Sequence, residues 1–418
     1  MSDKKLSTEP YKGVRDFFPA EMAVQDYIFA TWSRTAAQFG FQHYEASVLE
    51  PSILYKSKGA ENEELVNEQT YTFLDRGDRE VTLRPEMTPT VARMIAHQER
   101  SLHFPVRWYS IPNLFRYERP QRGRLREHWQ LNADIFGGDQ VTGDIEIITL
   151  AVTILQNFGA DLSMFEIRLN DRREMESFYR DFGITDVNQQ RALTRLNDRF
   201  HKISKSDYRE ALIEILNNEK QVEAVYQLVT SESSGDNLVF QGLQALGITN
   251  VRIDRSLARG FDYYTGTIFE LFDTSSQNPR ALLGGGRYDN LTSMFSDKAI
   301  SGVGFGMGDV VMRDFLEEHK LLPTFATGPQ LRLLPMTTAE FSSAAVLAQT
   351  FRTSGVTVDI DHSSQKIGKK IAHAGAAHCQ FIIVIGAEEI ETSRFTLKNL
   401  ASGEESTGTV EDLLKVLR

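Results

Sequence analysis

The chain has 418 residues, too many for one compact core, so two or three domains are expected. Its net charge of -11 argues against a protein that coats nucleic acid along its whole surface, although a local basic patch could still bind phosphate. The single cysteine, Cys379, and a start without an apolar run (MSDKKLSTEPYKG) favour a reducing, cytoplasmic setting, and no stretch is apolar for long enough to suggest a membrane span.

The first part of the chain combines one long helix with many strands. Residues 20–39 place apolar side chains at helical intervals and end before Gly40, which predicts an amphipathic helix. Residues 41–51 then read as a strand closed by Pro51. Further short strands are expected in YTFLD, EVTLRP, VRWYSI, NLFRYE and LREHWQLNADIFG, so the chain up to about residue 155 is predicted to be rich in sheet.

The rest of the chain changes character twice. Residues 172–248 are charged and helical in pattern, which indicates an inserted helical subdomain. Residues 249–325 return to strand-like patterning, with glycine-rich runs in LLGGGRYD and SGVGFGMG. From residue 328 to 418, strands and helices alternate, which is typical of a small α/β domain with a mixed sheet.

Five arginines lie within RYERPQRGRLREHWQ, residues 116–130. The segment NLFRYERPQRGRLREHWQLNADIF reads as two antiparallel strands joined by a loop, and a solvated loop is the usual fate of such a charge run. The more specific interpretation is a phosphate-binding site. Each guanidinium group can donate two hydrogen bonds to phosphate oxygens and stays charged at every relevant pH. In that reading Arg116 faces one phosphate from the strand, and the arginines at the tip reach another.

The hairpin resembles motif 2 of the class II aminoacyl-tRNA synthetases, and the long helix with the strand before Pro51 resembles motif 1. The finer resemblance is to the histidyl-tRNA synthetase family. It rests on YKGVRDFFP, LRPEMTP, FRYERPQRGRLRE, RGFDYYTGTIFE and LGGGRYD, which occur in the family's order across essentially the whole chain. The resemblance implies an α+β catalytic domain with the class II antiparallel sheet (1–171 and 249–325), a helical insertion (172–248) and a C-terminal α/β anticodon-binding domain (328–418).

The resemblance also implies the reaction. Histidine attacks the α-phosphate of ATP, which enters with Mg²⁺, and the adenylate then passes histidine to the 3′ end of tRNA-His. The nucleophiles belong to the substrates, so positioning and neutralisation of phosphate charge carry the catalysis, and no metal-binding side chains are assigned. Arg116 and Arg259 are the expected catalytic residues, on either side of the α-phosphate. An edge-strand pairing of Arg259 with Asp262 is the structural alternative.

The resemblance assigns the remaining site residues by motif. Glu86, Thr88 and Gln130 are expected at the α-ammonium of histidine, although Thr88 could equally be a helix N-cap. Asp134, Tyr263 and Tyr264 match the family's imidazole positions, with Tyr264 favoured over Tyr263 because successive strand residues face opposite sides. Core packing is the alternative role for tyrosines on a strand, and Tyr288 is assigned to the amino acid pocket. The other assignments are Glu118, Gly304 and Gly306 at ATP, and Gln121, Arg122 and Arg124 at the tRNA acceptor end.

Motif 3 departs from the family pattern. GFGMGDVVMRDF has Val310 and Val311 where the family usually has Glu-Arg, and Arg313 lies two residues further on, on the wrong face of a helix. The missing arginine keeps a second reading open: a catalytically silent, histidine-sensing regulatory paralogue. The complete hairpin, Arg259 and the terminal domain favour the synthetase, and a generic RNA-binding module fails to explain RGFDYYTGT. Family members are homodimers, so a homodimer is expected. The sequence also fits tRNA contacts in the insertion and at Lys366, Lys369 and Lys370, although a solvated helix face explains these lysines equally well.

Overall fold

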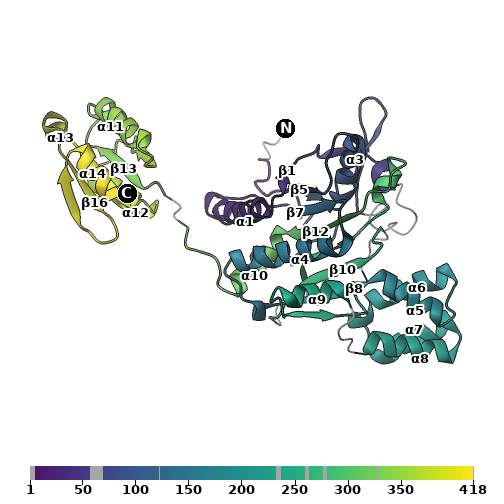
Figure 1. Cartoon of the computed structure of the whole chain (residues 1–418). Coiled ribbons are helices and arrows are strands. Elements are labelled where there is room, and N and C mark those ends of the chain that lie inside the picture. The colour runs from purple at the N-terminus through teal and green to yellow at the C-terminus, as the bar shows by residue number, and fades with distance from the viewer. Residues whose placement is uncertain are drawn as a thin grey trace. The chain divides into compact units, whose positions relative to one another are not determined.

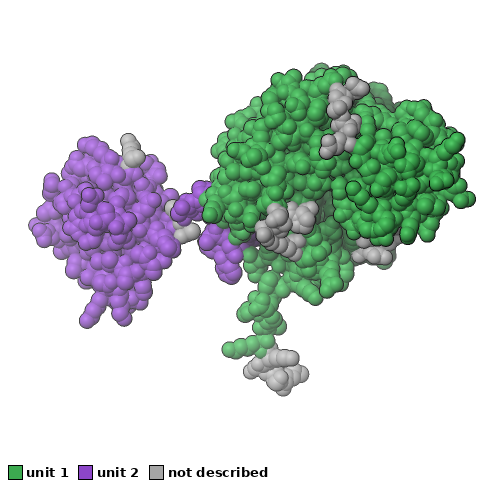
Figure 2. All heavy atoms as spheres, turned by 90° about the horizontal axis from the view of Figure 1, so that it is seen from below, with its two compact units in different colours: residues 1–16, 24–322 green, residues 17–23, 323–418 purple. Residues whose placement is uncertain are grey.

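The computed structural model describes residues 5–56, 69–121, 123–231, 237–258, 263–275, 280–325 and 328–417. The chain divides into two compact units: residues 1–16 with 24–322, and residues 17–23 with 323–418. Figure 2 colours the first unit green and the second purple. Within the described ranges, every helix is too short or too polar to cross a membrane.

A large, mostly antiparallel sheet forms the centre of the first unit. Its strand order is β1-β5-β7-β12-β11-β10-β8-β9, and β6 pairs with β7. The strands from β5 to β8 along this order are antiparallel neighbours, whereas the end pairs β1–β5 and β8–β9 are parallel. The antiparallel catalytic sheet expected from the sequence is therefore confirmed. Its strands are β1 (Gln42–His43), β5 (Val106–Ser110), β6 (Asn113–Phe115), β7 (Glu127–Phe136), β8 (Phe165–Asp171), β9 (Val251–Ile253), β10 (Thr267–Asp273), β11 (Ala281–Arg287) and β12 (Gly302–Gly308).

Helices cover both faces of this sheet (Figure 1). Helices α4 (Gln140–Asn157) and α10 (Asp309–Glu318) pack against β7 and β12 on one face. Helix α3 (Thr88–Gln98) shares a hydrophobic cluster with Phe136 and Tyr288 on the other. Because side chains alternate along a strand, the even-numbered residues of β7 lie on the α3 face and the odd-numbered ones face α4.

Two expectations for the N-terminal half need correction. The predicted helix at 20–39 is confirmed as α1 (Pro19–Gln38), but residues 41–51 form two short strands in different sheets. β1 belongs to the large sheet, whereas β2 (Leu49–Pro51) joins β4 (Glu80–Leu83) and β3 (Tyr71–Leu74) in a small antiparallel sheet next to α2 (Ile53–Lys56). Helix α4 was not predicted, because its buried positions extend round most of the helix and leave no clear amphipathic stripe.

Helices α5 to α9 follow β8 and lead into β9. They are α5 (Arg172–Asp181), α6 (Val187–Asp198), α7 (Lys205–Leu216), α8 (Glu219–Thr230) and α9 (Leu238–Ala245). Helices α5 to α8 share their own hydrophobic cluster, which includes Tyr179, Tyr208 and Val225. Short 3-10 turns occur at Leu162–Met164, Phe200–Lys202 and Leu291–Met294.

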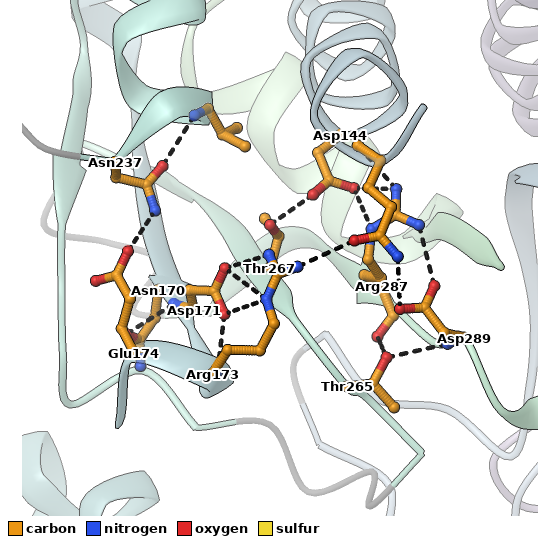
Figure 3. A network of polar contacts seen from close by, with 12 residues as sticks. Asp144, Asn170, Asp171, Arg173, Glu174, Asn237, Thr265, Thr267, Arg287 and Asp289 are labelled. Atoms are coloured by element: carbon orange, nitrogen blue, oxygen red, sulfur yellow. Dashed lines mark hydrogen bonds and ion pairs between the residues drawn. The ribbon is translucent and has the colours of Figure 1, made fainter. Parts of the chain in front are cut away.

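A polar network ties this helical segment to the sheet (Figure 3). Asp144 of α4 accepts hydrogen bonds from Arg287 of β11, at 2.6 and 2.9 Å, and from Thr267 of β10, at 2.6 Å. Asp171 pairs with Arg173 at 2.5 Å, where β8 passes into α5. Asp144 and Arg287 are both almost fully buried, so their mutual pairing is required to offset the cost of desolvation.

The second unit has the mixed sheet that the sequence predicted. Its strand order is β14-β13-β15-β16-β17, parallel up to β15 and antiparallel beyond it. Its elements are β13 (Leu331–Pro335), α11 (Phe341–Thr353), β14 (Val358–Ile360), α12 (Ile367–Ala376), β15 (Phe381–Ile385), α13 (Ala387–Thr392), β16 (Phe395–Asn399), β17 (Glu405–Gly408) and α14 (Val410–Leu417).

One lysine proposed for tRNA contact is buried in this second unit. Lys366 and Lys369 are exposed, but Lys370 is 3% exposed and donates a hydrogen bond to the backbone oxygen of Pro335 at 2.9 Å. Lys370 also pairs with Asp361 at 3.8 Å. The expectation for Lys370 is therefore wrong: this ammonium group holds α12 against the sheet.

Candidate active site

Asp134 and Gln130 lie on the α3 face of β7, each above a glycine of the neighbouring strand β12. The register pairs Asp134 with Gly304, and Gly306 with Asn132. A Cβ atom at Gly304 would overlap the Asp134 carboxylate, and one at Gly306 would overlap the Gln130 amide. Glycine is required at both places because these two polar side chains lie flat over β12. The structure therefore brings the predicted residues Gly304 and Gly306 beneath the predicted residues Asp134 and Gln130.

The Asp134 carboxylate is 1% exposed and is held by a tyrosine. The Tyr288 hydroxyl donates a hydrogen bond to Asp134 Oδ1, whereas Oδ2 has no hydrogen-bond partner among the described residues. Burial raises the pKa of Asp134 to about 7, against the lowering effect of the Tyr288 hydrogen bond. A buried acceptor oxygen left over in this way is suited to a ligand that brings its own donor.

Tyr263 contacts Tyr264, Tyr288 and Glu86, and the strand argument that separated the two adjacent tyrosines is wrong. Both precede β10, which begins at Thr267, so they do not alternate across a strand. Their ring centroids are 4.8 Å apart, and the Tyr263 ring meets the Tyr288 ring edge-on at 5.9 Å. The Tyr263 hydroxyl also donates a hydrogen bond to Glu86 Oε2 at 3.2 Å. Both tyrosines therefore belong to the same group of side chains as Asp134.

Glu86 and Thr88 lie at the start of α3. The predicted helix start near Thr88 is confirmed, but the N-cap residue is Met87, so Thr88 is the first helical residue and not the cap. Glu86 is 4% exposed, and Gln130 donates its amide to Asn132 Oδ1 at 2.9 Å. A carboxylate at a helix N-terminus is favoured by the helix dipole, which suits Glu86 for a buried position beside a cationic ligand.

The arginine hairpin has the predicted form, with β6 antiparallel to β7 and Gln121 paired with Arg124 across the tip. Arg116 Nε donates a hydrogen bond to the backbone oxygen of Pro85, immediately before Glu86, at 2.8 Å. Glu118 lies between two arginines, 3.0 Å from Arg124 and 3.9 Å from Arg116. Arg116 thus stands between the Asp134 side of the site and the hairpin tip. Arg122 lies outside the described residues.

Arg126 braces the hairpin. Its guanidinium lies 4.0 Å from the ring centroid of Tyr117 and donates a hydrogen bond to the hydroxyl of Tyr11 at 2.9 Å. Its backbone nitrogen donates to the backbone oxygen of Gly13 at 2.7 Å. The YKGVRDFFP motif at the N-terminus is therefore explained in part by its packing on the hairpin.

Asp309, at the start of α10, connects this N-terminal motif to the sheet. Its fully buried carboxylate accepts hydrogen bonds from Arg15 at 2.6 Å, from Gln25 at 2.8 Å and from the backbone nitrogen of Trp129 at 3.0 Å. Asp309 thus joins α10 by hydrogen bonds to the N-terminal motif, to α1 and to β7. Arg259, the second expected catalytic residue, lies outside the described residues.

Two side chains on the same face of β7 were missed by the sequence analysis. His128 and Asn132 alternate with Gln130 and Asp134, so the period of two along the strand was the signal that could have found them. Desolvation and then the positive charges of Arg116 and Arg15 lower the pKa of His128 to about 3. His128 is therefore a neutral imidazole beside the hairpin arginine.

Comparisons with known proteins match most of the chain to one family. Residues 13–308 match the family model of histidyl-tRNA synthetase. The chain belongs to the histidyl-tRNA synthetase family. Residues 330–418 match the model of an anticodon binding domain, which corresponds to the second unit.

Similar proteins cover the full length of the chain. The histidine–tRNA ligase of Leptospira biflexa serovar Patoc is 37% identical, over 100% of this chain and 99% of the relative. That of Thermoplasma volcanium is 36% identical, over 99% of each. A crystal structure of histidyl-tRNA synthetase from Nostoc sp. PCC 7120 has the same fold, with a TM-score of 0.83, 23% identity and 99% of both chains covered. An ATP phosphoribosyltransferase regulatory subunit/histidyl-tRNA synthetase from Bacillus halodurans C also shares the fold, with a TM-score of 0.73, 21% identity and coverage of 91% of this chain and 99% of that one.

Asp134→Asn is expected to stabilise the ligand-free protein at pH 8 more than at pH 4. The folded pKa of about 7 lies above the unfolded value of about 3.9, so wild-type stability falls as pH rises between these two values. Asparagine does not titrate, so the free energy of unfolding of the variant should exceed that of the wild type by about 4 kcal/mol at pH 8. Urea unfolding followed by fluorescence measures it, because Trp32, Trp108 and Trp129 all lie in the first unit. If the difference in unfolding free energy between the variant and the wild type did not change with pH, burial would not disfavour the ionised form of Asp134.

Proposed function

We propose that this chain activates histidine with ATP to histidyl-adenylate and transfers it to the 3′ end of tRNA-His. The observation that carries the proposal is the buried Asp134 carboxylate, held by Tyr288 at one oxygen and surrounded by tyrosines, beside a hairpin of arginines. A carboxylate oxygen in need of a donor suits one ring nitrogen of histidine, and the arginines suit phosphate. The full-length similarity to proteins named histidine–tRNA ligase supports the same reading.

The amino acid is assigned to the α3 face of the sheet. Asp134 accepts the imidazole N–H, while Tyr263, Tyr264 and Tyr288 enclose the ring. Glu86, Thr88 and Gln130 receive the α-ammonium, since a buried ammonium needs acceptors around it. A site built from such groups rejects amino acids of similar size, because its own polar atoms would be left unpaired.

The nucleotide is assigned to the hairpin side of the site. Arg116 and Arg259 flank the α-phosphate and stabilise the charge that develops there during adenylate formation. Glu118 positions Arg116 and Arg124 by its ion pairs with both. Gly304 and Gly306 allow the close approach of the ligand to the sheet backbone, and Mg²⁺ is expected to enter bound to ATP.

The macromolecular partners follow from the same proposal. Gln121, Arg122 and Arg124 at the hairpin tip are assigned to the acceptor end of tRNA-His, and residues 328–418 to its anticodon. The limits 1–171, 172–248 and 249–325 remain our proposal for the catalytic segments and their helical insertion. A cytoplasmic homodimer is part of the proposal too. The small antiparallel sheet and α2 expose Leu49, Ile53, Phe73 and Leu74, which are suited to a second copy of the chain.

ATP–pyrophosphate exchange with each of the amino acids in turn tests the function. We expect exchange with histidine alone, followed by aminoacylation when tRNA-His is added. The regulatory paralogue is the competing function, favoured by the missing motif 3 arginine. Histidine binding without any exchange would establish that alternative and refute the synthetase.

A further inference from the structure

The triphosphate of ATP needs a cation that α10 does not supply at its expected place. Val311 occupies the position where the family resemblance leads us to expect an arginine. Arg313, the next arginine on α10, donates its Nε to Glu317 Oε1 at 2.8 Å, one turn further along the same helix. Arg313 is therefore engaged along the surface of α10 and is not the substitute.

Arg280 reaches the same place from a different segment. It immediately precedes β11 and lies against Gly123 at the tip of the hairpin, where the backbone φ is +74°. A Cβ atom at Gly123 would lie 3.1 Å from Arg280 Cδ and 3.6 Å from Val311 Cγ2. The stem of Arg280 and the small side chain of Val311 therefore pack at one point of the hairpin tip. A longer side chain at position 311 would compete with Arg280 for this space.

The guanidinium of Arg280 belongs to a group of like charges. Its pKa is lowered, first by desolvation and then by the positive charge of Arg124, while Glu118 acts in the opposite direction. Glu118 is already paired with Arg124 at 3.0 Å and lies 3.9 Å from Arg116. The guanidinium groups of Arg116 and Arg124 thus lie near the Glu118 carboxylate, and Arg280 interacts electrostatically with Arg124 and Glu118. A group of guanidinium side chains of this kind is suited to a polyphosphate, because each fork can pair with phosphate oxygens.

We propose that Arg280 binds the terminal phosphates of ATP and takes the place of the missing motif 3 arginine. The inference rests on the proposed function for the identity of the nucleotide. The cation approaches from the start of β11 instead of from α10, and the loss of the arginine at position 311 is what makes room for it. Arg116 and Arg280 then hold the triphosphate from two sides of the hairpin tip.

Arg280→Met tests the proposal, because methionine keeps an unbranched stem against Gly123 and removes the charge. In histidine-dependent exchange we expect the KM for ATP to rise about 10- to 100-fold, the loss typical of one charged hydrogen-bonding group. The KM for histidine should stay within about twofold, since Arg280 lies on the nucleotide side of the site. Arg313→Met is the matched control, with the same chemical change on a side chain paired elsewhere, and should leave both constants unchanged.

Nucleotide binding by thermal shift separates a lost phosphate contact from a general defect. Arg280→Met should weaken ATP binding while AMP, which lacks the terminal phosphates, binds as to the wild type. The double variant Arg280→Met, Val311→Arg should recover part of the ATP affinity. Equal weakening of ATP and AMP, or an unchanged KM for ATP, would overturn the proposal. Absence of histidine-dependent exchange in the wild type would instead refute the proposed function, and the comparison of ATP with AMP would still decide the role of Arg280.

Discussion

Arg116→Ala is expected to lower the kcat of histidine-dependent ATP–pyrophosphate exchange by about 100- to 1,000-fold, the loss typical when one preorganised charge-stabilising donor is removed. Arg116 is anchored by Pro85 and held near Glu118, so its guanidinium is oriented before the substrate arrives. A fixed donor at the α-phosphate stabilises the transition state more than the ground state, and the loss should appear chiefly in kcat. Steady-state exchange with saturating histidine and ATP measures it.

The matched control for this arginine is Arg107→Ala. Arg107 lies on β5, next to β7, and donates hydrogen bonds to Glu146 of α4 at 2.5 and 2.8 Å. These bonds lie on the α4 face of the sheet, opposite the α3 face that holds Asp134. Removal of the Arg107 side chain should cost stability but leave exchange nearly unchanged. The same severe loss is expected for Arg259→His, with the fold intact. Normal exchange by the Arg116 variant would remove Arg116 from the catalytic residues.

Asp134→Asn is expected to lower kcat/KM for histidine by about 10³-fold or more. A site that hydrogen-bonds its substrate loses much of its transition-state binding when one of its polar groups cannot pair with the substrate. The asparagine amide presents a donor where the imidazole N–H needs an acceptor. Tyr288 can still donate to the remaining carbonyl oxygen, so the surrounding packing should persist. Exchange measured over a range of histidine concentrations tests this result.

Asp134→Glu provides the conservative comparison. The longer side chain of glutamate keeps the charge, so we expect kcat/KM within about tenfold of the wild type, far above the asparagine variant. Asp134→Asn should also be more stable than the wild type at pH 8. The two results together would show that the Asp134 carboxylate favours histidine binding and lowers the stability of the ligand-free protein. If the asparagine variant used histidine as well as the wild type, Asp134 would not be the imidazole acceptor.

Most of the fold could be predicted because its local patterns agree with its long-range packing. The amphipathic spacing of α1, the alternation along β7 and the alternating strands and helices after residue 328 each indicate the element that forms. Helix α4 escaped prediction because it is buried on most sides, and the strand at 41–51 was wrong because its two halves pair with different sheets. The alternation of apolar and polar residues within a short strand does not show which other strand it pairs with.

The candidate site divides in the same way. The types and order of its residues were visible in the sequence, including Asp134, Arg116 and the departure at Val311. The local sequence could not show that Tyr263 and Tyr264 share one cluster, because neither belongs to a strand. Nor could it show that Lys370 points inward to Pro335. Both facts depend on which distant backbone lies opposite the side chain.

The sequence by itself determined the family resemblance, the arginine hairpin, the expected chemistry and the absence of the usual motif 3 arginine, because these follow from residue types at short spacing. Only the tertiary structure decided which cation lies beside Val311. Arg280 is 31 residues away along the chain, and it reaches the hairpin tip because β11 and β12 are neighbours in one sheet. Contacts made through sheet pairing leave no trace in local spacing, and for that reason the position of Arg280 required the structure.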